Sequence, residues 1–387
     1  MRFHTELAHS FRGKPAALPG RYTAGVPHPL HDYDWSGFLR RPLFPSPSSE
    51  ELAGLEQASI LITGAGGSIG SALALRIATL KPRQITLLES SESFLFALEG
   101  ALHKRGVKAR LVLGDSADRA LLDEISRRYR PTLIFHTAAY KQVPLLESQP
   151  LAALGNNITA TAAVLDAATR IHARVVLLST DKAAAPSSVM GASKRICELL
   201  AMRHGQIALR LANVLASRDS VAGIFAAQIA AREPITLTSR EASRYFITLD
   251  EAVNLLLAAS IAPHSPALFV PALSKPHAIA DLAHTLASFL SSNAGPQIQL
   301  TGLRPGDKPH EALCAQDELL ANAHCPSLRQ IAYTALRADF DRHYEALRTA
   351  ITMRNLPQAI AALRIIVPGF TPSDVLLGVL NEGEECR

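Results

Sequence analysis

The sequence predicts an α/β protein with a doubly wound parallel sheet and a smaller C-terminal lobe. Three observations lead to this fold class. From Ser59 onward, short apolar runs alternate with stretches of helix length, a glycine-rich loop joins the first run to the first helix, and beyond about Ser217 the alternation breaks into shorter, proline-rich pieces. Strands that are short and apolar throughout are buried on both faces, which requires helices on both sides of a parallel sheet.

The expected elements alternate between strand and helix along the chain. Strands are expected at 60–62, 85–88, 111–113, 133–135 and 175–178, where the residues are apolar throughout. Helices are expected from Ser68, at 92–104, 118–129 and 150–171, and around Met190–Lys194. The apolar stretch 252–262 predicts a further, buried helix.

The same pattern divides the chain into four parts. Residues 1–50 are expected to form an N-terminal arm and linker, with a Pro/Ser cluster at 41–49, and residues 51–216 the sheet domain. Residues 217–335 are assigned mainly to the smaller lobe, with 245–262 returning to the sheet domain. Residues 336–387 are expected to form a helical extension.

Composition and charge exclude several classes of function. The 387 residues are 48% hydrophobic, enough to fill a large core. The 39 basic residues are interleaved with 34 acidic ones, for a net charge of +5, and no basic stripe carries aromatic residues. We therefore expect no nucleic-acid partner, and the surplus charge suits a diphosphate-bearing substrate better.

Cysteine usage and hydropathy indicate a reducing compartment. The four cysteines show no C-x-x-C or Cys/His spacing, so neither disulfides nor a metal site are expected. The first fifty residues lack the apolar core of a secretory signal, and no stretch reaches the roughly 18 apolar residues of a membrane span. We expect a cytoplasmic protein without a transmembrane segment.

The run Thr63-Gly-Ala-Gly-Gly-Ser-Ile-Gly70 lies between the first strand and the first helix. Its glycines let the backbone approach a pyrophosphate, and the helix that follows offers free N–H groups and a positive dipole end. The alternative is a tight turn without a ligand. The residues expected to contact a dinucleotide cofactor here are Gly64, Gly67, Ser68, Ile69 and Gly70.

Glu89 ends the second strand, 25 residues after Gly64. A carboxylate there can accept hydrogen bonds from the adenosine ribose and disfavours the 2′-phosphate of NADP, so we expect NAD, with NADP as the alternative. Asp115 and Ser116 follow the third strand, where Asp115 is expected at the adenine. For all three residues, capping of the next helix is the competing interpretation.

The fourth strand is followed by His136-Thr-Ala-Ala-Tyr-Lys141. In parallel sheets the carboxyl ends of the strands meet the cofactor, and the small Ala138 and Ala139 would leave room for it. We interpret His136 as a structural histidine. Tyr140 is a weaker candidate for an acid or base.

Two further runs carry the chemistry. Ser179-Thr-Asp-Lys182 ends the fifth strand, and Met190-Gly-Ala-Ser-Lys194 begins the next helix. Short-chain dehydrogenases normally have Tyr-x-x-x-Lys in the second run, and a tyrosine beside a lysine can accept a proton near neutral pH. Methionine cannot, so either the protein is inactive or Asp181 and Lys182 do the acid and base work. Lys194 is expected at the nicotinamide ribose.

Together these residues resemble the polysaccharide-biosynthesis nucleotide-sugar 4,6-dehydratases of the extended short-chain dehydrogenase/reductase superfamily, in particular the UDP-N-acetylglucosamine 4,6-dehydratases with Met in place of Tyr. The resemblance runs from about Ser59 to Leu313 and implies a Rossmann fold. Many members carry an N-terminal membrane domain, so this chain looks like a short, soluble form. Besides the glycine loop it rests on the runs 136–147, 156–157, 179–183, 189–195, 244–246 and 303–308.

The resemblance implies dehydration of a UDP-N-acetylhexosamine by a cofactor that is reduced and reoxidised in one turnover. Thr180 would orient the sugar 4-hydroxyl, Lys182 would remove the C5 proton, and Asp181 would protonate the departing 6-hydroxyl. The group that accepts the 4-hydroxyl proton stays open. Matching positions for substrate binding, mostly at its diphosphate, are Lys141, Asn213, Arg218, Arg244 and Arg304.

Some positions depart from the family's pattern and leave the substrate's identity open. Asp219, which follows Arg218 directly, stands where a glycine is usual, and its carboxylate would oppose a nearby phosphate. The other departures are Gln142, Ala185, Leu211, Ala212 and Ala216. The alternatives are a nucleotide-sugar epimerase, whose ordinary mechanism needs the missing tyrosine, and a non-catalytic cofactor-binding protein. The resemblance also implies self-association through the helices that begin at Pro150 and Val189.

Overall fold

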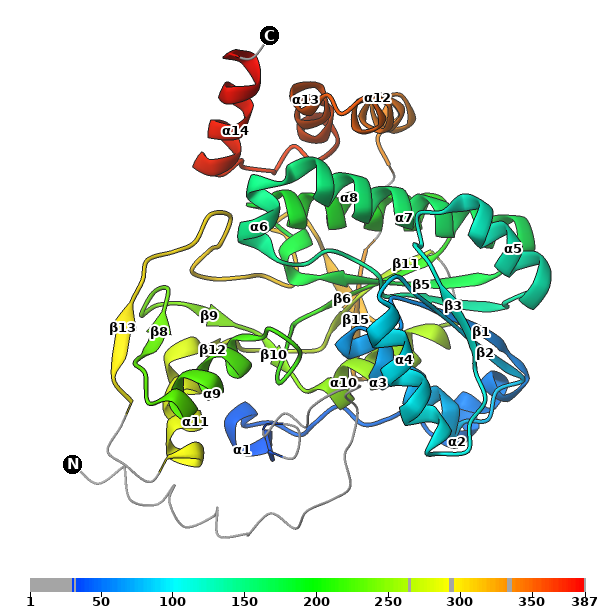
Figure 1. Ribbon diagram of the computed structural model, residues 1–387, viewed down its shortest axis with the longest axis horizontal. Helices are drawn as coiled ribbons and strands as arrows, with labels where there is room; N and C mark the ends of the chain where they lie inside the picture. The colour runs from blue at the N-terminus through cyan, green and yellow to red at the C-terminus, as the bar shows by residue number, and fades with distance from the viewer. Residues whose placement is uncertain (1–29, 31–32, 264–265, 292–295, 333–335, 386–387) are drawn as a thin grey trace.

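A nine-stranded sheet with helices on both faces forms the body of the protein (Figure 1). The computed structural model describes residues 30, 33–263, 266–291, 296–332 and 336–385. The strand order is β14-β15-β11-β6-β5-β4-β1-β2-β3, and the pairs from β11 to β3 are all parallel. The predicted doubly wound sheet is confirmed. The expectation that it is wholly parallel is wrong at one edge, because β15 and β14 pair antiparallel.

The strands and helices of this domain lie close to the predicted ranges. The strands are β1 (Ser59–Thr63), β2 (Gln84–Glu89), β3 (Arg110–Leu113), β4 (Leu133–His136), β5 (Arg174–Thr180), β6 (Ile207–Leu211), β11 (Ala267–Pro271), β14 (Leu320–Asn322) and β15 (Leu328–Ile331). The helices are α3 (Ser68–Thr79), α4 (Glu92–His103), α5 (Arg119–Tyr129), α6 (Val143–Ser148), α7 (Pro150–Ile171), α8 (Val189–Arg203) and α10 (Leu249–Ser260).

Two helical layers enclose the sheet. Helices α5, α7 and α8 pack side by side on one face, and α3 packs against α4 and α10 on the other (Figure 1). Nearly every residue of α10 is buried, as its unbroken apolar sequence predicts. The strand β3 differs from expectation: it is an edge strand, so its second side is open and Leu113 is 55% exposed.

The smaller lobe has its own hydrophobic core. Helices α9 (Val221–Ala231) and α11 (Ile279–Leu290) pack together there, beside three short strand pairs. The pairs are β7 (Asn213–Val214) with β10 (Phe246–Ile247), β8 (Ile235–Leu237) with β13 (Ile298–Leu300), and β9 (Ser243–Arg244) with β12 (His277–Ala278). The assignment of 217–335 mainly to this lobe is too broad, because β11, β14 and β15 complete the main sheet. The expected return of 245–262 to the sheet domain agrees with the packing of α10 on α3.

The segment before the sheet domain packs against both parts. Tyr33, Trp35 and Phe38 belong to the core of the smaller lobe, and Phe38 lies in the short helix α1 (Ser36–Leu39). Arg41 pairs with the buried Glu251 of α10 at 2.5 Å, and α2 (Ser49–Leu52) and the 3₁₀ helix η1 (Ala53–Gln57) lead into β1. The described part of the predicted arm is therefore fixed to the fold. The rest of the arm lies outside the described residues.

Three helices form the C-terminal extension. Helix α12 (Phe340–Thr352) packs on α7, α13 (Leu356–Ile366) packs on α12, and α14 (Asp374–Glu385) contacts α6 (Figure 1). The expected self-association surface on α7 and α8 is thus covered in part by the chain itself. No helix among the described residues is both long enough and apolar enough to cross a membrane.

Candidate functional site

The glycine loop between β1 and α3 has the shape of a dinucleotide cradle. Gly64 has a φ of +66°, and a Cβ there would lie 2.6 Å from the backbone of Ala138. A Cβ on Gly70 would lie 2.2 Å from the carbonyl oxygen of Gly64. The N-cap of α3, Gly67, supplies no side-chain hydrogen bond, so the first turn with Ser68 and Ile69 keeps N–H groups for an anion. These residues fit the predicted cofactor.

Glu89 lies at the end of β2, beside this loop. Its carboxylate accepts hydrogen bonds from the N–H groups of Gly66 at 2.8 Å and Ser91 at 2.9 Å, so its orientation is fixed. Ser91 is the N-cap of α4, which makes Glu89 a support of that cap rather than the cap itself. The capping interpretation is wrong for Asp115 and Ser116, because Asp118 caps α5.

After β3 and β4, short loops run along the same edge of the sheet. Asp115 is exposed and accepts a hydrogen bond from the N–H of Ala117, whereas Ser116 is buried. Ala138 and Ala139 lie where β4 ends, as predicted. The amide side chain of Asn157 on α7 bonds both the N–H and the carbonyl of Tyr140 and so holds this loop. The Tyr140 side chain is 53% exposed.

His136 is a buried structural residue, in agreement with the interpretation from the sequence. Its two ring nitrogens lie 2.7 Å from Thr63 Oγ1 and 3.1 Å from Thr161 Oγ1. Burial, with a contribution from the charge of Lys194, lowers the pKa of His136 to about 3. The ring is therefore neutral at physiological pH and does not serve as a proton carrier.

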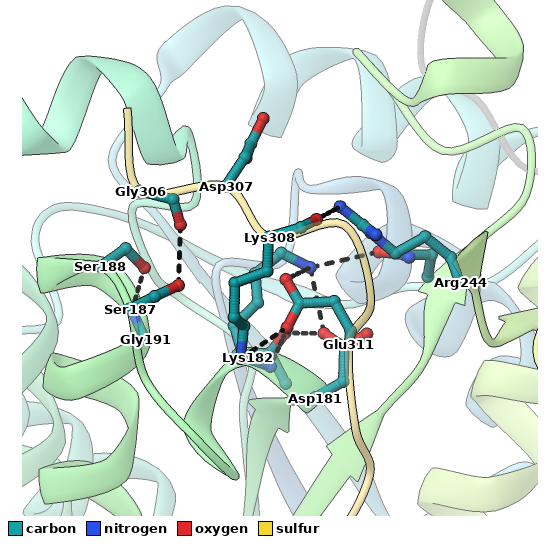
Figure 2. A network of polar contacts seen from close by, with 12 residues as sticks. Asp181, Lys182, Ser187, Ser188, Gly191, Arg244, Gly306, Asp307, Lys308 and Glu311 are labelled. Carbon is teal, nitrogen blue, oxygen red and sulfur yellow. Dashed lines mark hydrogen bonds and ion pairs between the residues drawn. The ribbon is translucent and has the colours of Figure 1, made fainter. Parts of the chain in front are cut away.

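The buried Asp181 pairs with the half-buried Lys182 on the 3₁₀ turn η2 (Asp181–Ala183) that follows β5 (Figure 2). Asp181 Oδ1 accepts hydrogen bonds from Thr180 Oγ1 at 3.0 Å and Lys182 Nζ at 3.1 Å. Asp181 Oδ2 is buried without a hydrogen-bond partner among the described residues. A buried carboxylate oxygen without a hydrogen-bond partner is unfavourable unless a ligand donates a hydrogen bond to it. Lys182 Nζ also donates to Asn213 Oδ1 at 3.4 Å.

Glu311 is a member of this cluster that sequence reasoning missed. Its side chain is 2% exposed, its Oε1 lies 3.9 Å from Lys182 Nζ, and its Oε2 lies 3.3 Å from Lys308 Nζ (Figure 2). Oε2 nevertheless has no hydrogen bond among the described residues. The available signal was its place three residues beyond Lys308, at the end of the matching run 303–308.

The charges of the cluster decide the protonation of Lys182. Burial alone favours the neutral amine, but the carboxylates of Asp181 and Glu311 outweigh burial and the opposing charge of Arg244. The pKa of Lys182 is therefore above its ordinary value. Lys182 therefore carries its proton in this state.

Helix α8 brings Met190 and Lys194 to the same place. A Cβ on Gly191 would lie 2.5 Å from the carbonyl oxygen of Lys182, so the first turn of α8 packs directly on η2. Met190 is 4% exposed and belongs to the apolar core. Lys194 is 5% exposed, its Nζ makes no hydrogen bond to any residue in the described part of the chain, and burial lowers its pKa.

The predicted substrate-binding residues do not all meet at Lys182. Arg244 lies near it, with its guanidinium held by the carbonyls of Lys308 and Pro309, each at 2.7 Å (Figure 2). Arg304 is 55% exposed and pairs with Asp307 at 2.7 Å. Lys141 Nζ donates to the carbonyl of Arg218 at 2.7 Å. Arg218 itself lies beside the glycine loop, over the ring of Phe94.

Known proteins resemble this chain in sequence and in fold. "Probable polysaccharide biosynthesis protein EpsC" of Bacillus subtilis is 35% identical over 80% of this chain and 53% of its own length. A "UDP-glucose 4-epimerase" of Rickettsia bellii is 32% identical over 67% of this chain and 79% of its own. The X-ray structure of Pen from Bacillus thuringiensis, 26% identical, superimposes with a TM-score of 0.67 over 72% of this chain and 88% of that one.

The extent of these matches shows which family the chain belongs to. It spans about half the length of the first curated relatives it matches. The family model described as "Polysaccharide biosynthesis protein" matches residues 60–332, which is more than half of the chain. Its sheet and glycine loop confirm the resemblance to extended short-chain dehydrogenases/reductases. The chain therefore belongs to the polysaccharide biosynthesis protein family, the nucleotide-sugar dehydratase-like branch of the extended short-chain dehydrogenases/reductases.

Proposed function

We propose that the protein removes water from a UDP-N-acetylhexosamine, with UDP-N-acetylglucosamine as the first candidate, and forms a 4-keto-6-deoxy sugar for surface-polysaccharide synthesis. The observation that carries this proposal is the ion pair of buried Asp181 with Lys182, next to Met190 where an ordinary dehydrogenase has tyrosine. Asp181 Oδ2 has no hydrogen-bond partner in the described part of the chain. A bound NAD or NADP would supply the hydride acceptor for C4 and the hydride donor for C6.

Proton balance assigns the role of Asp181. The overall reaction releases the 4-hydroxyl proton and supplies one proton to the departing 6-hydroxyl, so a group that takes the first can give the second. Asp181 Oδ2 accepts no hydrogen bond from any residue that the structure describes and is the atom able to hold that proton. Thr180 Oγ1, bonded to Oδ1, orients the sugar hydroxyl beside it.

Lys182 must be neutral when it takes the proton from C5. In the free protein the two carboxylates keep it charged, but the proton taken up by Asp181 removes one of them. The pKa of Lys182 then falls, and the ammonium releases its proton to solvent, which leaves the neutral amine. The Glu311 carboxylate stabilises the ammonium that forms again when Lys182 takes the C5 proton. The same lysine returns that proton to C5 as hydride reaches C6, and it then regains a proton from solvent, which closes the cycle.

The remaining residues divide between cofactor and substrate. The cradle around Gly64, with Glu89 fixed beside it, supports a nicotinamide dinucleotide, and NAD is favoured because a carboxylate at the end of β2 disfavours a 2′-phosphate. Lys194 is buried and makes no hydrogen bond with a described residue, so its ammonium is available to donate to the nicotinamide ribose. Asn213 and Arg244 near Lys182 support binding of the UDP-sugar.

A nucleotide-sugar epimerase is the second candidate. The name of the Rickettsia relative favours it, since that protein matches most of the same residues. The absence of an ionisable side chain at Met190 speaks against it, because epimerisation by oxidation and re-reduction depends on a base at that position.

The test is product analysis of the purified chain with UDP-N-acetylglucosamine and UDP-N-acetylgalactosamine. We expect a product that has lost one water. Its rate of formation should fall at least about 100-fold in Asp181→Asn and Lys182→Met, with the cofactor still bound. Lys275→Met, at an exposed lysine, is the matched control and should keep full activity. A product of unchanged mass would favour the epimerase, and bound cofactor without turnover of either sugar would favour a binding protein.

A further inference from the structure

Arg218 lies across the glycine loop, far along the sequence from its neighbours there. Its backbone N–H donates to Ser68 Oγ at 2.9 Å, and Ser68 is the first residue of α3. Its guanidinium carbon lies 3.9 Å from the ring centroid of Phe94, on α4. A guanidinium stacked on an aromatic face is held in one plane with its edge free to donate.

The segment 214–220, which we call the strap, is fixed at this point from three sides. Besides Ser68 and Phe94, Lys141 Nζ holds the carbonyl of Arg218 at 2.7 Å. These anchors come from α3, α4 and the loop after β4, and the same elements border the cradle. A Cβ on Gly66 would lie 2.5 Å from Phe94 Cβ and 3.1 Å from the carboxylate of Glu89. Gly66 of the glycine loop thus lies between the Cβ of Phe94 and the side chain of Glu89.

The guanidinium of Arg218 forms no ion pair with the residues that the structure describes. Within the described part of the chain, no carboxylate lies within ion-pair distance of it, and the adjacent Asp219 is exposed. By contrast, Arg244 donates hydrogen bonds to backbone carbonyls, and Arg304 pairs with Asp307. Arg218 is therefore a half-buried cation next to the open first turn of α3, where two sources of positive potential converge.

We infer that Arg218 binds the pyrophosphate of the dinucleotide cofactor rather than the diphosphate of the sugar nucleotide, and that the strap closes over the cofactor. This inference rests on the cofactor of the proposed function. Glu89 and Arg218 then act on the same half of the dinucleotide, with the carboxylate at the ribose hydroxyls and the guanidinium at the phosphates. A strap of this kind retains the dinucleotide while it is reduced and reoxidised within one turnover.

The test is equilibrium binding to the full chain after removal of bound nucleotide, by calorimetry with NAD⁺, with NADP⁺, and with UDP at saturating NAD⁺. We expect Arg218→Ala to weaken NAD⁺ binding about 10- to 100-fold and UDP binding less than about twofold, the range of a lost hydrogen bond to a charged group. Phe94→Leu keeps the apolar volume but removes the stacking face, and should weaken NAD⁺ about threefold or more. Arg240→Ala, at an exposed arginine of the same lobe, is the matched control and should bind like the parent.

Each other outcome has a defined meaning. Weaker UDP binding with unchanged NAD⁺ binding would overturn the inference and return Arg218 to the substrate. A loss confined to NADP⁺ would also overturn it, because it would place the guanidinium at a 2′-phosphate. Unchanged binding of all three ligands by Arg218→Ala and Phe94→Leu would leave Arg218 with no ligand and overturn it as well. If the parent protein binds neither NAD⁺ nor NADP⁺, the proposed function fails together with the inference.

Discussion

At the scale of single residues, Glu311 shows how a distant part of the sequence controls the reacting lysine. It lies 3.9 Å from Lys182 Nζ and raises the pKa of that amine together with Asp181. Glu311→Gln removes one of these charges, so the pKa of Lys182 should fall. The acid limb of the pH–kcat profile should then move to lower pH, since activity requires neutral Lys182. The plateau rate should fall about tenfold, because the ammonium formed at C5 proton removal loses a partner.

The control for Glu311 comes from the same loop. Asp307 pairs with Arg304 and points away from Lys182 (Figure 2), so Asp307→Asn should leave the acid limb in place. A Glu311→Gln profile that coincides with that of the parent protein would contradict the role given to Glu311 and reduce it to packing of the loop.

His136 makes folding stability depend on pH. Its pKa is about 3 in the folded protein against an ordinary value of 6.5, so the unfolded chain binds the proton more tightly. The contribution of His136 to the free energy of unfolding is fully present above pH 6.5. It is lost as the pH falls towards 3, at about 1.4 kcal/mol per pH unit. Urea unfolding between pH 6 and 4 should give a shallower pH slope for His136→Gln than for the parent. His284→Gln, at an exposed histidine, should keep the parent's slope, and equal slopes for all three proteins would refute the assignment.

The residues of the site differ in how far the sequence could predict them. Asp181, Lys182, Met190 and Lys194 lie within 14 positions of one another at a strand end and on the helix that follows, so the strand–helix pattern alone brings them together. Glu311 reaches Lys182 only through the fold of the smaller lobe and the loop from 301 to 311. Local periodicity carries no information on such long-range contacts.

At the scale of elements, the strap has two residues in an unusual conformation. Ala216 and Asp219, which stand where the related enzymes usually have glycine, both have a φ of +57°. Aspartate tolerates this region better than most residues, and a β-branched side chain tolerates it poorly. We expect Asp219→Gly to be at least as stable as the parent and Asp219→Val to lose about 1 kcal/mol or more in urea unfolding. Equal stability of the two variants would contradict this backbone conformation.

The elements themselves could be predicted where burial shapes their sequence. The strands β1, β2, β4 and β5 and the helix α10 are largely apolar because they lie inside the sheet or between layers. The strand β3 was predicted, but its edge position and the antiparallel pairing of β14 and β15 were not, because a short run shows neither its neighbours nor its direction. The predicted boundaries of the smaller lobe were wrong for the same reason.

At the scale of the whole molecule, the C-terminal extension changes which surfaces are free. Helix α12 packs on α7, Arg203 of α8 holds Asp341 through two hydrogen bonds, and Leu347 is fully buried. Further on, Ser373 Oγ donates to Glu147, whose second oxygen accepts the N–H of Val189 at the start of α8. The extension is thus joined to the helix that carries Met190 and Lys194.

This cover predicts the association state. The full chain should sediment as a monomer, because α12 covers part of the α7–α8 surface through which the resemblance implies self-association. Leu347→Asp should undock α12, expose apolar residues of α7, and cause self-association in sedimentation velocity. Met353→Asp, at a 74% exposed side chain near the end of the same helix, should stay monomeric. A stable dimer of the parent that Leu347→Asp leaves unchanged would place the interface elsewhere.

The most direct test of the account is mass spectrometry of the product formed from UDP-N-acetylglucosamine in heavy water. The Asp181–Lys182 mechanism predicts a sugar that has lost one water and carries one deuterium at C5, because Lys182 exchanges its protons with solvent before it returns one to carbon. A product of unchanged mass apart from exchange at oxygen and nitrogen, or a dehydrated product without deuterium at C5, would contradict it.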